Sequence, residues 1–262
     1  MAKRHIKWGE RTYRRFLKEG RGQGELAAYN PWIHTHDFPS RGKVTRILGR
    51  VTGRIHHLMS QHELDCFLYL EELPGIEDIK EQYPLPLYKT QLAAARLNIR
   101  HPEVNGFPWV MTTDFVYRRN GRWHAVQVKT SSELEEPRVQ EKFSIEKACW
   151  EDSGISWRVM TEKDLSAAHS YNVLWLRSGA GLETLIPDPA EREAVMQGFL
   201  ELYQDGTIDF HILLEEVDKV QEYVPGTAMQ IFKALVMRGQ IALDLSRPLN
   251  LSDPRQLPYL SV

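Results

Sequence analysis

Hydrophobic and polar residues interleave on both sides of the pair Asn120-Gly121, in the stretch TTDFVYRRNGRWHAVQVK. Asn-Gly favours a two-residue hairpin turn, because both positions accept a positive φ. A turn at this pair places Asp114 opposite Gln127 on the neighbouring strand. Directly opposed residues share a face of the sheet, and so do residues two apart on one strand. We therefore expect Lys129 beside these two side chains, although an ordinary charged face of a hairpin would show the same pattern.

A second signal is the stretch after Ser60, where Leu64, Phe67 and Leu68 have the spacing of a packed helix. Ser60 and Glu63 have the S-x-x-E spacing of a capping box, in which the glutamate bonds back to the amide of the serine. The alternative is that Glu63 points toward the sheet and shares a metal ion with Asp114. The sequence leaves both readings open.

Together these patterns predict an α/β fold with a mixed central sheet and helices on both faces. Residues 84–109 are expected to be a connection with one short helix at Gln91–Arg96. The remaining expected elements are a basic helix and linker in 1–30, short strands at 43–48 and 54–58, helices at 60–73 and 137–152, and strands at 76–83, 110–118, 122–130 and 156–161.

The pattern changes after Leu165, where helices are expected at 188–203, 208–223 and 227–238, followed by a strand at 241–245. Helices followed by a strand after a glycine turn suggest a winged helix. We expect a basic N-terminal arm and lead-in (1–58), a catalytic core (59–165) and a winged-helix-like C-terminal domain (166–262).

Charge is distributed unevenly along the chain. Residues 1–58 hold 13 Lys and Arg against 4 Asp and Glu, whereas residues 165–262 hold 7 against 13. A basic arm suits phosphate contacts, and an acidic module is repelled by DNA, so the latter is expected to bind protein. The candidate DNA contacts are Arg11, Arg14, Arg15, Lys18, Arg54 and His57, although the first four also fit a solvated amphipathic helix.

The sequence also disfavours a membrane-spanning, secreted or zinc-binding protein. No apolar run is long enough to span a bilayer, and the N-terminus lacks the apolar region of a signal peptide, so a cytoplasmic protein is expected. Cys66 and Cys149 have no metal or redox spacing and are expected to be buried. His34, His36 and Asp37 have no second ligand pair at zinc spacing, which disfavours a zinc site.

The grouping of a carboxylate, an amide and a lysine suits phosphodiester hydrolysis. Mg²⁺ prefers oxygen ligands, lowers the pKa of an attacking water and stabilises charge on phosphorus. Glu146 lies in an apolar stripe of the expected helix 137–152. A carboxylate there needs a partner such as Lys129, or lies at the solvated edge of the stripe.

Several motifs resemble the TnsA family, the endonuclease subunits of the Tn7-type heteromeric transposases, within the restriction-endonuclease-like superfamily. The order of the motifs is also that of the superfamily: a helix with Glu, a strand, then Asp on one strand and (Asp/Glu/Gln)-x-Lys on the next. Gln127 departs from the usual acid of the superfamily but agrees with the TnsA pattern. The matching stretches are KEGRGQG (18–24), PW (31–32), TGRIHHLMSQHEL (52–64), EDIKEQYPL (77–85), MTTDF (111–115), VQVK (126–129) and ExxxW (146–150).

The resemblance implies a restriction-endonuclease-like core that cuts the 5′ ends of a transposon during cut-and-paste excision. It implies Mg²⁺, with Mn²⁺ as a substitute, and as partners double-stranded DNA, the TnsB transposase and the TnsC regulator. A stand-alone restriction-type nuclease and a decayed DNA-binding adaptor are the alternatives. The implied active site is Glu63, Asp114, Gln127 and Lys129. From the chemistry of the residues we also expect the main-chain oxygen of Val128 as a metal ligand and Glu146 behind the site.

Overall fold

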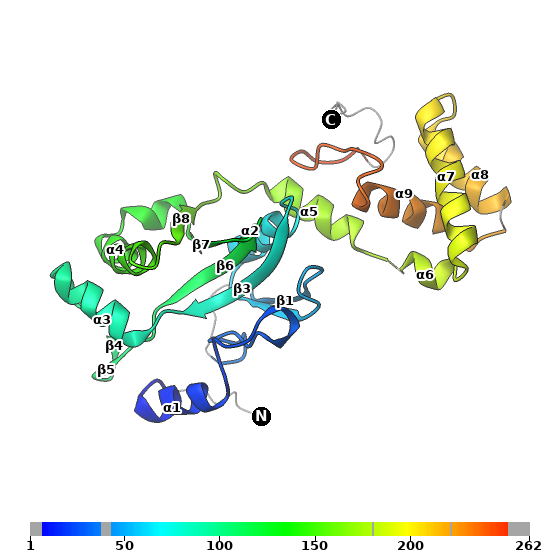
Figure 1. Ribbon diagram of the computed structural model, residues 1–262. Coiled ribbons are helices and arrows are strands. Elements are labelled where there is room, and N and C mark those ends of the chain that lie inside the picture. The colour runs from blue at the N-terminus through cyan, green and yellow to red at the C-terminus, as the bar shows by residue number, and fades with distance from the viewer. Residues whose placement is uncertain (1–6, 38–42, 180, 221, 251–262) are drawn as a thin grey trace. The chain divides into compact units, whose positions relative to one another are not determined.

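The computed structural model describes residues 7–37, 43–179, 181–220 and 222–250 (Figure 1). The chain divides into two compact units, residues 1–165 and 166–262. Residues 1–58 therefore belong to the same unit as the residues expected to form the catalytic core. Each unit is described separately below.

A four-stranded mixed sheet forms the centre of the first unit, in the order β3-β6-β7-β8. Strand β6 is antiparallel to both β3 and β7, and β8 runs parallel to β7. This confirms the expected mixed sheet. The bounds are β3 Ile76–Pro84, β6 Thr112–Arg119, β7 Arg122–Val128 and β8 Ser156–Met160, with two-stranded sheets formed by β1 Thr45–Leu48 with β2 Ile55–Leu58 and by β4 Glu103–Val104 with β5 Phe107–Pro108.

The hairpin between β6 and β7 has the turn and register expected from the sequence. Asn120 and Gly121 both have positive φ, 48° and 74°, as a type I′ turn requires. Phe115 pairs with Val126, and the pairing continues in register toward the turn. Asp114 and Gln127 are the next opposed positions beyond that pair.

Helices cover both faces of the sheet. Helix α2 (Gln61–Glu71) packs on one face, where Phe67 stacks on Phe115 of β6. On the other face α3 (Leu87–Arg96) and α4 (Pro137–Glu151) share a core with β6 and β7. Helix α3 begins four residues before the short helix expected from the sequence, and a 3₁₀ turn (Ser131–Glu135) precedes α4.

The N-terminal segment is held to this unit by aromatic packing. Helix α1 (Glu10–Lys18) places Phe16 in a cluster with Trp8 and Trp32, and the ring centroids of Phe16 and Trp32 are 5.3 Å apart. The guanidinium of Arg21 lies 3.6 Å from the centroid of the Phe16 ring. Residues 26–28 form a 3₁₀ turn.

Helices form the described part of the second unit, and their core includes Phe199, Phe210 and Phe232. The strand expected at 241–245, and with it the wing, is absent from the described residues, which corrects the winged-helix prediction. The amide of Asn172 binds the carbonyls of Leu245 and Arg247 instead. The helices are α5 Ala167–Leu176, α6 Leu182–Leu185, α7 Pro189–Asp205, α8 Phe210–Val220 and α9 Thr227–Met237.

Among the described residues, we find no helix that combines the length and apolar character needed to cross a membrane. Cys66 and Cys149 are free thiols and are buried, as their sequence context predicted.

Candidate active site

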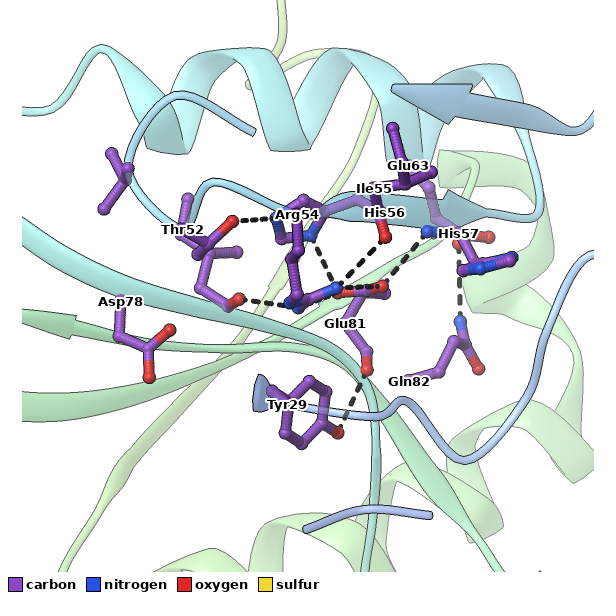
Figure 2. Close-up of polar contacts among 12 residues, drawn as sticks. Tyr29, Thr52, Arg54, Ile55, His56, His57, Glu63, Asp78, Glu81 and Gln82 are labelled. Carbon is purple, nitrogen blue, oxygen red and sulfur yellow. Dashed lines mark hydrogen bonds and ion pairs between the residues drawn. The ribbon is translucent and has the colours of Figure 1, made fainter. Parts of the chain in front are cut away.

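Two buried carboxylates from different elements meet at the same hydrogen-bond donor. Glu63 lies in the first turn of α2, and Asp114 lies in β6. The side-chain nitrogen Nε2 of Gln82, in β3, is 3.3 Å from Oε2 of Glu63 and 3.1 Å from Oδ1 of Asp114. Figure 2 shows the contact between Gln82 and Glu63. The structure therefore places the two acids on the same side of the sheet.

The first turn of α2 directs Glu63 to this position. Oγ of Ser60 accepts from the backbone N–H of Glu63 at 3.1 Å, as expected for an N-cap residue. The carboxylate of Glu63 accepts from the N–H of Met59 at 2.9 Å, whereas a capping box would use the N–H of Ser60. The carboxylate also accepts from the Ser60 hydroxyl at 3.2 Å, which leaves it facing Gln82.

Strand β6 changes face at Asp114. Phe115 packs against Phe67 on the α2 side, yet Thr113, two residues earlier, bonds Glu146 on the α4 side. Residues two apart on a regular strand would share a face. The position opposite Asp114 on β3 is Gln82, since Glu81 pairs with Phe115 and Tyr83 with Thr113.

Strand β3 changes face at the same level. Glu81 contacts His56 of β2, whereas Tyr83 packs against Trp150 of α4. Gln82 between them has φ 48°, a left-handed conformation that costs a non-glycine residue on the order of 1–3 kcal/mol. Its carbonyl accepts from the N–H of Trp32. The left-handed backbone at Gln82 places its side-chain amide between Glu63 and Asp114.

The environment of Glu63 and Asp114 disfavours the ionised form of both carboxyl groups. Burial, and then the neighbouring Asp114 carboxylate, raise the pKa of Glu63. Burial also raises the pKa of Asp114, although the N–H of Val128, 2.9 Å from Oδ2, and the charge of Lys129 oppose this shift. The shared donor of the two carboxylates, the amide of Gln82, is neutral, and a divalent cation would supply positive charge that favours their ionised forms. The donor set therefore fits a hard metal ion.

Gln127 and Lys129 lie beside the pair, although not simply on one face with it. Oε1 of Gln127 accepts from the backbone N–H of Asp114 at 3.0 Å, which occupies one of its two lone pairs. Nζ of Lys129 is 3.6 Å from a carboxylate oxygen of Glu133 and its side chain is about a third exposed. Both residues line a pocket of about 650 Å³ that also contains Glu146.

Glu146 is buried on α4, so it does not lie at a solvated edge, and its hydrogen bonds go to partners other than Lys129. Its Oε1 accepts from the Thr113 hydroxyl at 2.6 Å and from the indole N–H of Trp157 at 2.9 Å. Burial raises the pKa of Glu146 to about 8, against the effect of these two hydrogen bonds. Glu146 therefore supports Thr113, the residue next to Asp114.

Arg54 has an internal partner instead of the DNA contact suggested by its charge. Its Nη1 and Nη2 bind the two carboxylate oxygens of Glu81 at 2.8 and 2.5 Å, and both residues are buried. Nδ1 of His56 is 2.7 Å from the same carboxylate, and the N–H of His57 donates to it at 3.0 Å (Figure 2). This network fixes β3 directly before Gln82.

Burial lowers the pKa of two histidines near this network, His57 and His34, which disfavours the cationic form that would contact phosphate. Nδ1 of His57 accepts from the N–H of Thr35 at 3.2 Å, and burial lowers the pKa of His57. Its ring stacks on His34, whose pKa burial lowers to about 4. Ligand atoms of His34, His36 and Asp37 lie within 4.8 Å of one another. Arg21 already binds both oxygens of Asp37, which makes this a weak metal site.

The cations expected to contact DNA from the first helix are exposed on α1. Arg11 and Lys18 face solvent. Arg14 pairs with Glu10 at 2.6 Å and Arg15 with Glu19 at 3.4 Å. Such exposed pairs exchange partners at little cost, so all four cations remain available to a phosphate backbone.

Sequence reasoning missed Gln82 and its partner Thr112, whose hydroxyl donates to Oε1 of Gln82 at 3.1 Å. The sequence contained the expected strand at 76–83 but no local signal for its register or for the positive φ at Gln82. Only the pairing of β3 with β6 shows that Gln82 lies opposite Asp114.

Comparison with known proteins identifies the family of this chain. Residues 73–162, which contain Asp114, Gln127 and Lys129, match the family described as TnsA-like endonuclease N terminal. The protein is thus of the transposon endonuclease class. Over 249 residues the chain is 33% identical to the transposon Tn7 transposition protein TnsA of Escherichia coli, covering 94% of this chain and 90% of that protein. The chain belongs to the TnsA family.

Proposed function

We propose that this protein is a Mg²⁺-dependent DNA endonuclease that cuts the 5′ ends of a Tn7-like transposon, while a TnsB transposase cuts the 3′ ends. The observation that carries the proposal is the buried pair of Glu63 and Asp114, joined through Gln82 Nε2. Family membership supports the reaction class. Mn²⁺ is expected to replace Mg²⁺, because both accept oxygen ligands.

Each residue near the pair has a proposed part in the reaction. Glu63, Asp114, Gln127 and the main-chain oxygen of Val128 would hold the ion, which stabilises charge on the phosphate and lowers the pKa of the attacking water. Lys129 would contact the scissile phosphate, since its side chain is partly exposed beside the acids. Glu146 would keep Thr113, and through it Asp114, in place.

The pocket that Gln127 and Lys129 line offers a path for the DNA strand. Its lining includes the cations Lys129, Arg138 and Lys142 and the aromatic residues Trp109 and Phe143. Cations suit the sugar–phosphate backbone, and aromatic rings suit bases that leave the stack. The exposed cations of α1 would contact the duplex farther from the cut.

The second unit is the proposed binding site for a TnsC regulator. Residues 165–262 carry 7 Lys and Arg against 13 Asp and Glu, which disfavours contact with phosphate. An apolar pocket of about 490 Å³ lies between α7 and α8. Its lining includes Phe199, Leu202 and Leu213, and it could bind an apolar side chain of a partner protein.

A nicking assay on transposon-end DNA tests the proposed function, with Mg²⁺ or Mn²⁺, TnsB and TnsC present. The unaltered chain should cut the 5′ strand, and Asp114→Asn should not. Equal cutting by Asp114→Asn would show that the site is misassigned. Cutting of the same DNA without TnsB and TnsC would instead favour a restriction-type nuclease acting alone, and failure to cut would favour a DNA-binding adaptor.

Deletion of residues 166–262 tests the second unit. The remaining chain should still unfold cooperatively on heating and bind Mn²⁺, but lose association with TnsC in a pull-down. Retained TnsC binding would assign that contact to the first unit.

A further inference from the structure

The side-chain amide of Gln82 lies between the carboxylates of Glu63 and Asp114 and donates hydrogen bonds to both. Its two Nε2 hydrogens serve one acid each, Asp114 at 3.1 Å and Glu63 at 3.3 Å. The residue is 5% exposed. An amide N–H₂ carries only a partial positive charge, so this arrangement satisfies the hydrogen bonds of the acids but leaves their charge uncompensated.

The other end of the same amide faces a partner that can reverse its role. Oε1 of Gln82 accepts from the Thr112 hydroxyl at 3.1 Å. A hydroxyl group both donates and accepts. Rotation of the amide by half a turn would therefore direct Nε2 to Thr112 and Oε1 to the acids without loss of the bond to Thr112.

We propose that Gln82 is a switchable member of the metal site, which bridges Glu63 and Asp114 through Nε2 without metal and turns Oε1 toward a divalent cation when one binds. This proposal rests on the metal site of the proposed function and adds an oxygen donor to it. A cation repels the amide N–H₂ and attracts the amide oxygen, which is a hard ligand. Gln82 therefore acts as a positioning residue in the metal-free protein and as a ligand in the loaded one.

The left-handed backbone and the environment of Gln82 support a dedicated role. The residue keeps φ 48° although it is not a glycine. The preceding residue, Glu81, is anchored by Arg54 and His56, and the carbonyl of Gln82 itself binds the N–H of Trp32. The backbone is thus held from both sides, and only the side-chain torsions are free to respond to an ion.

Calorimetric titration of Mn²⁺ into the 262-residue chain tests the proposal. Gln82→Leu should weaken binding roughly 10- to 100-fold, the range measured when groups that support a metal site are removed. Gln82→Glu should bind Mn²⁺ more tightly than the unaltered chain, and its metal-free form should melt at a lower temperature because a third carboxylate joins the pair. Thr112→Val should weaken binding less than Gln82→Leu.

The opposite results overturn the proposal. If Gln82→Leu binds Mn²⁺ as tightly as the unaltered chain or more tightly, the amide of Gln82 is not a metal ligand. It then only occupies the space between the acids until the ion displaces it. If the unaltered chain binds no Mn²⁺, or Asp114→Asn binds it equally well, the proposed metal site itself fails, and that outcome is distinct.

A second measurement needs no variant at Gln82. In protein labelled with ¹⁵N-glutamine, Mg²⁺ should shift the side-chain amide resonances of Gln82. The resonances of Gln197, whose Nε2 binds Glu201 at 2.7 Å in the second unit, serve as the internal control and should stay in place. Unmoved Gln82 resonances at a Mg²⁺ concentration that saturates calorimetric binding would also overturn the proposal.

Discussion

Arg54 and Glu81 form a two-pronged ion pair in the interior of the first unit, with N–O distances of 2.8 and 2.5 Å. Arg54 joins β2 to β3, since it precedes β2 and its Nη2 also donates to the carbonyl of Ile79. The pair holds the residue directly before Gln82, so it connects the stability of the sheet with the geometry of the candidate site.

Loss of Arg54 should destabilise the fold strongly. Arg54→Ala leaves the buried Glu81 carboxylate without its main partner, which should lower the free energy of unfolding by about 3–5 kcal/mol. The matched control is Arg14→Ala, which breaks the exposed pair of Arg14 and Glu10 and should cost no more than about 1 kcal/mol. Urea denaturation measures both. Equal losses for the two variants would contradict the structural role of Arg54.

We predict that the free energy of unfolding depends on pH through the buried carboxyl group of Glu146. Burial raises its folded-state pKa to about 8, above the ordinary value of 4.5. Its contribution to stability is therefore fully present below about pH 4.5 and is lost as the pH rises toward 8, by up to about 1.4 kcal/mol per pH unit.

Glu146→Gln should remove the Glu146 share of this dependence, because an amide oxygen can still accept from Thr113 and Trp157 but never ionises. The share of Glu63, whose pKa burial also raises, should remain. Urea denaturation at pH 5 and pH 8 would compare this variant with Glu151→Gln, an exposed position on the same helix. The Glu151 variant should follow the profile of the unaltered chain. A Glu146 variant with an unchanged pH profile would refute the assignment.

We predict that the exposed cations of α1 make the affinity for DNA depend on salt concentration. Arg11 and Lys18 are exposed, so replacing both with alanine should remove two phosphate contacts. The slope of log K against log salt should then become shallower by about 1.8, from a value of about 0.9 per contact. Fluorescence anisotropy with duplex DNA measures this slope. Lys219→Ala, an exposed lysine of the acidic unit, should leave the slope unchanged, and an unchanged slope in the double variant would exclude α1 as a DNA contact.

Local sequence signals were sufficient for much of the first unit. Asn120-Gly121 determined the turn and register of the β6–β7 hairpin, and Ser60 marked the N-terminus of α2. These predictions succeeded because a two-residue turn and an N-cap depend on neighbours in the sequence. The role of Asp114 in metal binding remains a prediction.

Features that depend on distant partners were not predictable. The alternation rule placed Asp114, Gln127 and Lys129 on one face, but the strands change face at Asp114 and at the strained Gln82. The burial of Arg54 depends on Glu81, 27 residues away. In the second unit, α5 was missed, and the expected strand at 241–245 is not a strand. The side chain of Asn172 in α5 binds the carbonyl of Leu245 instead.

The central claim is that Glu63 and Asp114 share a divalent cation. A crystal structure of the protein grown with Mn²⁺, examined at a wavelength where manganese scatters anomalously, tests this claim most directly. We predict an anomalous peak within coordination distance of both carboxylates. No peak there, or a peak only at His34, His36 and Asp37, would contradict the account.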